Sequence, residues 1–258
     1  MAPLEFFLLS RFMIFTLVLA RIGGMIVIAP IFGTLALPRQ VRAFLAVAIA
    51  LLVTPLYLNT SLPPITDLAT YVHLMANEVA IGLLLGLGVT IMFSGIQVAG
   101  QIVSQMSGLS LADVFDPGFD ESVSMFTQLF HFLTMAVFVA IGGHRIMIGA
   151  VLETFAWAPP GHAALGETYV DALTDLMTQS FSLGIHAAAP LMVALFLSTI
   201  VLGLIGRTLP QINIIAVGFG INSFLTLAMT LLSLGAVAWT FQEPTIEAIR
   251  TMQDTLHP

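Results

Sequence analysis

The stretch GLIGRTLPQINIIAVGFG, residues 203–220, places a polar centre inside one of the most apolar parts of the chain. Arg207 is the only charged residue between positions 176 and 242. Pro210 removes a backbone donor that a continuous helix would need, and Gln211 and Asn213 add polar side chains beside it. Two interpretations fit: the turn of a helical hairpin, or the interruption of a broken transporter helix.

The composition of the whole chain is that of a membrane protein. Of the 258 residues, 58% are apolar and only 8% are charged, and the mean hydropathy is +1.03. About 20 apolar residues suffice to cross a bilayer as a helix. Long uncharged stretches occupy residues 22–38, 43–66, 79–112, 122–144, 176–206 and 208–242. These stretches predict an all-α, multi-helix hydrophobic fold.

Apolar runs bounded by Pro, Gly and charged residues predict the positions of the helices. The predicted helices are 4–29, 41–58, 70–106, 122–142, 145–156, 168–205 and 212–250. Proline within or beside these runs, at Pro30, Pro38, Pro55 and Pro190, predicts bends. The polar connections are short enough to be loops, so we expect a single domain.

A simple succession of spanning helices does not agree with the charges of the loops. Arg39 and Arg42 would place the first connection in the cytoplasm. The connection at 107–121 would then also be cytoplasmic, yet it carries four acidic residues and no basic one. We interpret the disagreement as a sign that the helices do not all lie in lipid as an ordinary bundle.

Small residues recur on one predicted helix. Gly82 and Gly86 in the run VAIGLLLGLG allow another backbone to approach closely. We interpret them as helix-packing positions within the chain, with contact to another subunit as the alternative.

No catalytic, metal or nucleotide motif is present in the sequence. The chain has no Lys and no Cys, and it lacks HExxH and GxSxG, which excludes a P-loop, thiolate chemistry and the usual zinc and acyl-transfer sites. A net charge of −7 argues against binding to nucleic acid. We therefore expect neither an enzyme nor a bound cofactor or metal ion.

Three charges lie inside apolar runs, where each needs a partner or water. They are Arg21, Glu78 and Arg207. Glu78 could relay protons in a transporter or could pair structurally with Arg21 or Arg207. We favour the structural pairing, because a relay needs more than one buried acid along a path.

The connection 107–121 combines glycines with bulky apolar side chains. Met106, Leu109, Phe115 and Phe119 could close a pore by excluding water. From the residues alone, the simpler interpretation is that these side chains pack on their own helices.

Five segments stand out in order along the chain: RIGGMIVIAPIFGTLALPRQVRAFLAVAIALLVTP (21–55), NEVAIGLLLGLG (77–88), AGQIVSQMSGLSLADVFDPG (99–118), GGHRIMIGAVLETFAWAPPG (142–161) and APLMVALFLSTIVLGLIGRTLPQINIIAVGFG (189–220). Taken together, these segments resemble the FliR family of flagellar and type III secretion export-gate proteins. The resemblance covers almost the whole chain.

The resemblance implies a core subunit of an export gate in the bacterial inner membrane, at the flagellar basal body or an injectisome. Such a subunit is wound with FliP-like and FliQ-like subunits around a channel for unfolded export substrates. The core is raised towards the periplasm, and FlhB-like and FlhA-like components lie nearby. Within the chain, 1–175 would be the FliP-like part and 176–258 the FliQ-like helical hairpin.

The resemblance also implies roles for the singled-out residues. Residues 182–206 and 212–241 would form the hairpin, and its tip at the cytoplasmic entrance would hold Arg207, Pro210, Gln211 and Asn213. The segment 107–121 corresponds in position to the family segment that seals the idle channel, so the plug interpretation now takes precedence. The alternative function is a secondary transporter with a substrate site at a broken helix near the membrane midplane.

Overall fold

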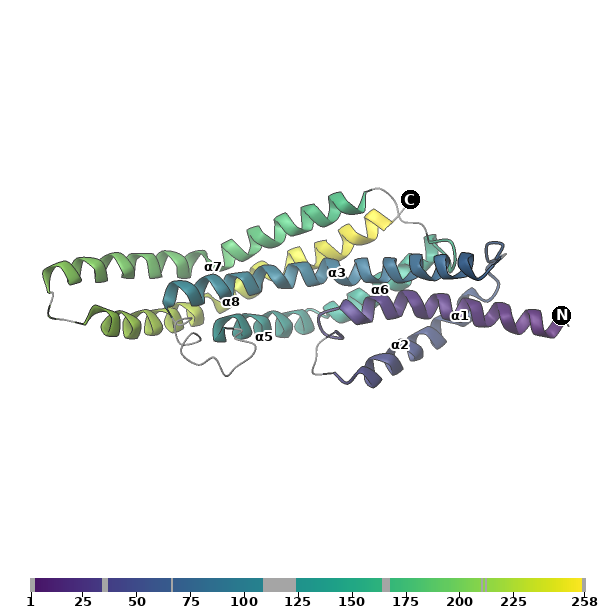
Figure 1. The fold of residues 1–258 in the computed structure, drawn as a ribbon, viewed down its shortest axis with the longest axis horizontal. Helices are drawn as coiled ribbons and strands as arrows, with labels where there is room; N and C mark the ends of the chain where they lie inside the picture. Colours follow the sequence, from purple (N-terminus) through teal and green to yellow (C-terminus); the bar gives the residue numbers. More distant parts are fainter. Residues whose placement is uncertain are drawn as a thin grey trace. The chain divides into compact units, whose positions relative to one another are not determined.

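The computed structural model describes residues 3–33, 37–65, 67–108, 124–163, 168–209, 211 and 213–256. Within these residues every regular element is a helix (Figure 1), which confirms the predicted all-α fold. In chain order the elements are α1 (Pro3–Ile28), α2 (Arg39–Val53), the 3-10 turn η1 (Thr54–Tyr57), α3 (Leu68–Ser107), α5 (Met125–Ala140), α6 (Gly143–Trp157), α7 (Tyr169–Thr208) and α8 (Ile214–Leu256).

Polar residues beside the apolar runs begin several of these helices. Asp67 accepts a hydrogen bond of 3.0 Å from the backbone N–H of Thr70 and so caps α3. Ser124 caps α5 in the same way, with a hydrogen bond of 3.2 Å from the N–H of Thr127. Each cap satisfies a donor that the first helical turn leaves without a partner in the helix.

The predicted break between helices 122–142 and 145–156 lies between α5, which ends at Ala140, and α6, which begins at Gly143. Gly142, between the two helices, has a left-handed backbone (φ 72°). A side chain at Gly142 would be strained in this conformation. The left-handed glycine therefore separates α5 from α6.

Prolines occur both inside helices and at their ends. Pro190 lies inside α7 and Pro244 lies inside α8. Pro38 directly precedes α2, where the missing N–H has no helical partner to lose. Pro55 lies in the first turn of η1, which follows α2 without a gap.

The chain divides into two compact units. Unit 1 comprises Met1–Ile91, Gly142–Leu176 and Thr245–Pro258, and unit 2 comprises Met92–Ile141 and Met177–Pro244. In unit 1, α1 lies beside α2 and η1 (Figure 1) and also contacts α6. Fully buried side chains of unit 1 include Leu17, Ile22, Met25, Ile81 and Phe155.

The core of unit 2 is built around an aromatic cluster. Phe93 of α3 packs edge-on against Phe138 of α5 and Phe241 of α8, with ring centroids 5.5 and 5.3 Å apart. The helices α3 and α7 approach so closely that a Cβ on Gly95 would collide with the carbonyl oxygen of Ser180, and one on Gly184 with that of Gly95.

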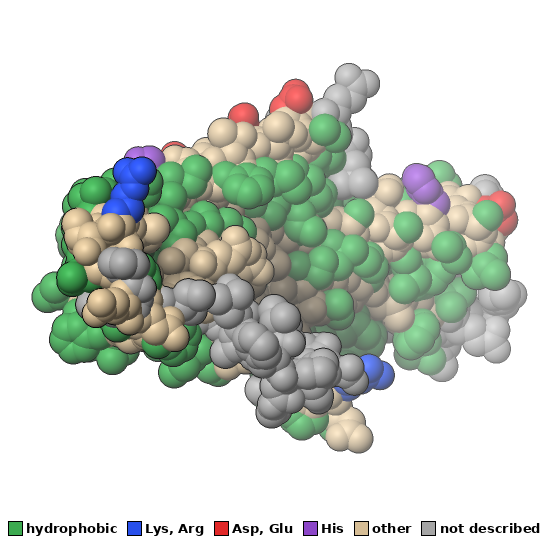
Figure 2. Space-filling view, turned by 60° about the vertical axis from the view of Figure 1, so that its left-hand side comes forward, with side chains coloured by type: hydrophobic (Ala, Val, Ile, Leu, Met, Phe, Trp, Pro, Cys, Tyr) green, Lys and Arg blue, Asp and Glu red, His purple; other side chains and the backbone are tan. Residues whose placement is uncertain are grey.

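Apolar side chains also cover much of the surface. Figure 2 shows them spread over the visible face, with charged side chains confined to a few places. Within the described residues, five helices are long and apolar enough to cross a membrane, or six if the bent α5–α6 pair counts as one span.

Candidate functional site

The best-defined polar site in unit 1 begins at the crossing of α1 and α3. A Cβ on Gly82 would collide with the carbonyl oxygen of Arg21, and one on Gly24 would lie 2.6 Å from that of Val79. Gly86 is also close, because its Cβ would lie 3.1 Å from the oxygen of Met25. The two backbones are therefore in direct contact, which places residue 21 opposite residue 78.

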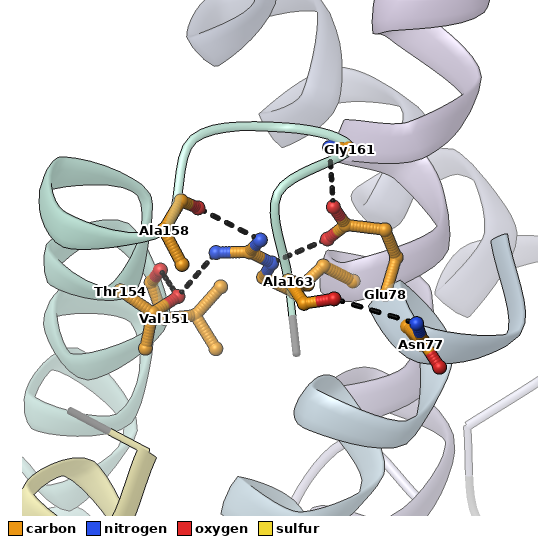
Figure 3. Close-up of polar contacts among 8 residues, drawn as sticks. Asn77, Glu78, Val151, Thr154, Ala158, Gly161 and Ala163 are labelled. Atoms are coloured by element: carbon orange, nitrogen blue, oxygen red, sulfur yellow. Dashed lines mark hydrogen bonds and ion pairs between the residues drawn. The ribbon is translucent and has the colours of Figure 1, made fainter. Parts of the chain in front are cut away.

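Arg21 lies at this crossing and is completely buried. Its Nε donates to Oε2 of Glu78 at 2.6 Å, Nη1 donates to Oγ1 of Thr154 at 2.9 Å, and Nη2 donates to the carbonyl oxygen of Ala158 at 2.9 Å (Figure 3). The guanidinium carbon also lies 4.0 Å from the centroid of the Phe155 ring. Each nitrogen of the guanidinium thus has an acceptor, and one face of the group has an aromatic partner.

Glu78 is equally buried and uses both carboxylate oxygens. Oε2 binds Arg21, and Oε1 accepts the backbone N–H of Gly161 at 2.8 Å (Figure 3). The neighbouring Asn77 donates through Nδ2 to the carbonyl oxygen of Ala163 at 3.4 Å. Glu78 is therefore tied to α1 and to the turn that follows α6.

The pair holds that turn at both ends. Arg21 binds Ala158, the residue that ends α6, and Glu78 binds Gly161, whose backbone is left-handed (φ 84°). A Cβ at Gly161 would lie 3.1 Å from Cδ of Pro63 and 3.3 Å from Cδ2 of Leu62. The buried charges therefore fix 158–161 against α1, α3 and the connection before α3.

This arrangement is suited to structure rather than to chemistry. Both charged groups are paired, hydrogen-bonded and out of contact with solvent. Within the described parts of the chain, no group of three or more His, Cys, Asp or Glu side chains could hold a metal ion. Arg21 and Glu78 stand out in the sequence as charges inside apolar runs. Their partners Thr154, Ala158 and Gly161 do not, because a hydroxyl, a carbonyl and a glycine N–H carry no local pattern.

The predicted hairpin tip lies in unit 2. α7 ends at Thr208, and Asn213 caps α8 by accepting the N–H of Ala216 at 3.2 Å. Arg207, Gln211 and Asn213 are exposed, whereas Pro210 lies outside the described residues. Close to the tip, Oγ of Ser198 donates to Oδ1 of Asn222 at 2.6 Å, which joins α7 to α8. Of the two partners predicted for Glu78, the structure pairs it with Arg21.

The predicted plug residues fall mostly outside the described residues. Met106 is half-buried near the end of α3, which is followed by Gly108 in a left-handed conformation (φ 79°). Leu109, Phe115 and Phe119 belong to residues 109–123, which the structure does not describe.

Comparison with known proteins identifies the family of the chain. The family described as "Bacterial export proteins, family 1" matches residues 12–247. The chain belongs to this family of bacterial export proteins.

Several members of this export family are similar over most of their length. The flagellar biosynthetic protein FliR of Caulobacter vibrioides is 30% identical, with 87% of this chain and 90% of the relative covered. FliR of Pectobacterium carotovorum is 31% identical, covering 83% and 80%. FliR of Escherichia coli is 28% identical, covering 83% and 81%.

The resemblance of the sequence to the FliR family is thereby confirmed. Membership in the bacterial export family and five or more apolar helices together indicate an inner-membrane component of protein export. The buried Arg21–Glu78 site lies within the matched residues and holds together α1, α3 and the end of α6 of this export protein.

Proposed function

We propose that this chain is a core subunit of a type III secretion export gate, and that it forms a channel for unfolded proteins together with FliP-like and FliQ-like subunits. The observation that carries the proposal is the family match over residues 12–247, with relatives that are named flagellar biosynthetic proteins. The flagellar names of these relatives favour a flagellum over an injectisome as the setting.

A subunit of a larger assembly needs surfaces that its own fold does not cover, and α7 and α8 have them. In the most apolar stretch of α7 only 22% of the residues are buried, against 56% for α3. Lipid or protein must cover such a surface. The large exposed apolar side chains of α7 and α8 in unit 2 are Met177, Phe181, Ile185, Val193, Phe196, Leu197, Ile200, Val201, Leu204, Val217, Phe219, Ile221, Phe224, Leu227, Leu231, Leu232 and Trp239.

The proposal gives separate roles to different parts of the chain. Residues 1–175 correspond to a FliP-like part and residues 176–258 to a FliQ-like hairpin. The exposed tip residues Arg207, Gln211 and Asn213, with Pro210, lie at the cytoplasmic entrance and face FlhB-like and FlhA-like components. Exposure of these side chains and the cap at Asn213 support a polar turn at this position.

The seal of the idle channel is assigned to Met106, Leu109, Phe115 and Phe119. Bulky apolar side chains close a narrow pore because water is expelled from it and ions cannot cross a dry segment. Unfolded substrate would open the passage by displacing these side chains, and other components of the apparatus would supply the energy.

Affinity purification in mild detergent tests the assembly. We expect the tagged chain to retain FliP-like and FliQ-like subunits, which mass spectrometry would identify. Leu197→Arg on the exposed apolar face of α7 is expected to release them, because a charge in such an interface has no partner. Gln179→Arg, at an exposed polar position of the same helix, is the matched control and is expected to retain them.

The same experiment separates the proposal from its rival. A chain purified as a single subunit that binds a small solute would contradict the export gate and favour a secondary transporter. Equal retention of partners by Leu197→Arg and Gln179→Arg would show that this face of α7 is not an interface.

A further inference from the structure

The second half of α3 has a polar outer face, unlike the other long helices of unit 2. Between Met92 and Ser107 every exposed position of α3 is polar: Ser94, Gln101 and Gln105. The spacings of seven and four residues place these side chains along one side of the helix. The opposite side is buried and includes Phe93, Ile96 and Val103 in its core contacts.

Polar side chains of α5 lie beside this face. Gln97 of α3 is half-buried and forms a hydrogen bond of 3.0 Å between its Nε2 and Nδ1 of His131 on α5. Gln128, one turn before His131, is exposed. A shallow hollow of about 220 Å³ on the surface of unit 2 is lined by Gln97, Thr127, Gln128, His131 and the exposed ring of Phe132. We call Ser94, Gln97, Gln101, Gln105, Gln128 and His131 together the amide track.

Lipid is an unsuitable neighbour for the amide track. Side-chain amides that face hydrocarbon lose their hydrogen bonds to water, so polar groups on membrane helices face protein or a water-filled cavity. In the part of the chain that the structure describes, the side chains of Gln101, Gln105 and Gln128 have no hydrogen-bond partner. The exposed positions of α7 and α8 that would suit lipid or an apolar partner are, by contrast, mostly large and apolar.

The chemistry of the amide track matches that of a polypeptide backbone. A glutamine side chain has one carbonyl acceptor and two N–H donors, the same groups that an unfolded chain presents along its whole length. Residues 79–112 contain no charged side chain, so the α3 part of the track cannot select substrates by charge. Because water competes for each hydrogen bond, contacts to a passing chain are short-lived.

We propose that the amide track lines a water-filled passage and makes transient hydrogen bonds to the backbone of an unfolded polypeptide in transit. The inference rests on the proposed export function and adds to it the residues that touch the cargo. Sequence-independent contact of this kind suits a passage that must accept many different unfolded proteins.

The absence of cysteine from the natural chain permits a direct test. Gln101→Cys and Gln105→Cys are made separately, and the assembled gate in membrane vesicles is treated with a charged, membrane-impermeant thiol reagent. Phe196→Cys, at an exposed apolar position of α7, is the matched control. We expect both glutamine variants to react at least about tenfold faster than the control, since the reagent reaches only water-exposed thiolates.

A substrate arrested in transit by a fused folded domain gives the second readout. We expect it to slow the labelling of Gln101→Cys. When a mild thiol oxidant is added, we also expect a single cysteine in its unfolded part to form a disulfide with that variant, the oxidant taking up the two electrons. We also expect Gln101→Leu/Gln105→Leu to lower the export rate by about two- to tenfold and Gln101→Asn/Gln105→Asn to restore most of it.

Retention of FliP-like and FliQ-like subunits is measured on the same samples, so that the two proposals can fail separately. Two results would overturn the amide track and leave the export function in place. In a complete, exporting gate, either neither glutamine variant is labelled, or arrested substrate leaves the rate of labelling unchanged. Loss of the partner subunits from the unmodified chain would count against the export function and, with it, against the track.

Discussion

At the scale of single residues, the buried pair of Arg21 and Glu78 is the most demanding feature of unit 1. Removing two charges from water is costly, and the cost is offset only when the charges are paired and their remaining hydrogen bonds are made. Here the other partners are neutral: Thr154, the carbonyl of Ala158 and the N–H of Gly161. The pair therefore fixes the turn after α6 through hydrogen bonds to its backbone.

Replacing only one partner should be strongly destabilising. We expect Arg21→Met or Glu78→Leu to lower the free energy of unfolding by about 3–5 kcal/mol, because the other charge is left buried and unpaired. The double variant should lose less than the sum of the two single losses. Thermal unfolding in detergent measures this, with the exposed Arg39→Met as control. Additive losses would show that the two side chains are not coupled.

Asp67 provides a pH-dependent contribution at the start of α3, outside the apolar span. Its pKa lies below the usual 3.8, chiefly because the carboxylate accepts hydrogen bonds from the hydroxyl and the backbone N–H of Thr70. A lowered folded-state pKa stabilises the fold above the unfolded-state pKa, and the contribution is lost as the pH falls below it. We expect Asp67→Asn, which caps without titrating, to reduce the loss of stability between pH 5 and pH 3 (on the order of two units around the ordinary pKa).

The measurement is unfolding by denaturant at each pH. Asp175→Asn, at an exposed position of α7, is the comparison variant. Identical pH profiles for the unmodified chain and Asp67→Asn would contradict the role of this cap.

At the scale of elements, close approach decides how the helices cross. α1 and α3 touch at Gly24 and Gly82, and α3 and α7 touch at Gly95 and Gly184. Without a side chain the backbones come close enough for dispersion contacts along both helices. These crossings bring residues far apart in the sequence, such as Arg21 and Glu78, within hydrogen-bonding distance.

Adding one methyl group at a crossing should push the helices apart. We expect Gly82→Ala to destabilise the protein by about 1–3 kcal/mol, since its Cβ would collide with the backbone of Arg21. Gly23→Ala is the matched control, because nothing lies within 4 Å of the added Cβ. There the higher helix propensity of alanine should be neutral or stabilise by up to about 1 kcal/mol. Equal effects in thermal unfolding would show that the crossing tolerates a side chain.

The hairpin tip depends on the cap at Asn213. We expect Asn213→Ala to lower stability by about 0.5–2 kcal/mol and to speed hydrogen exchange of the N–H of Ala216, which loses its acceptor. Asn213→Asp should preserve protection, because a carboxylate accepts the same bond. Gln211→Ala, at an exposed position of the tip, should leave exchange unchanged. Unaltered exchange in Asn213→Ala would contradict the capping role.

At the scale of the whole molecule, the apolar surface and the family membership both indicate that the fold is completed by lipid or by other subunits. α7 and α8 leave most of their apolar stretches uncovered by the chain itself, with 22% and 28% of the residues buried. A protein of the bacterial export family with such surfaces is completed by lipid or by other subunits. The two compact units and the proposed FliP-like and FliQ-like parts divide the chain differently, because the first reflects packing and the second likeness to other subunits.

The proposed seal is tested on the assembled gate. We expect Phe115→Ala to raise the leakage of ions through the idle gate, on the order of severalfold, because a smaller side chain no longer keeps the constriction dry. Phe224→Ala, an exposed aromatic on α8, is the control and should leave leakage at the level of the unmodified gate. Tight closure in Phe115→Ala would remove this residue from the seal.

The sequence alone determined the class of the protein and most of its helices. Hydropathy and helix-breaking residues act over a few turns, so the long apolar helices, the break near Gly142 and the polar turn around Asn213 could all be read from neighbouring residues. Buried charges were recognisable too, because Arg21 and Glu78 stand out in apolar runs. The order of several family-like segments in the sequence indicates the export family by itself.

Only the tertiary structure decided what those residues contact. Glu78 lies 57 positions from Arg21, and Thr154 lies 133 positions from it, so nothing local selects these partners over Arg207 or water. The same holds for the polar face of α3. The spacing of its glutamines puts them on one side of the helix, but only the packing shows that this side is exposed and the opposite side buried. Periodicity is a property of neighbours in the chain, whereas pairing and exposure arise from the packing of distant segments against one another.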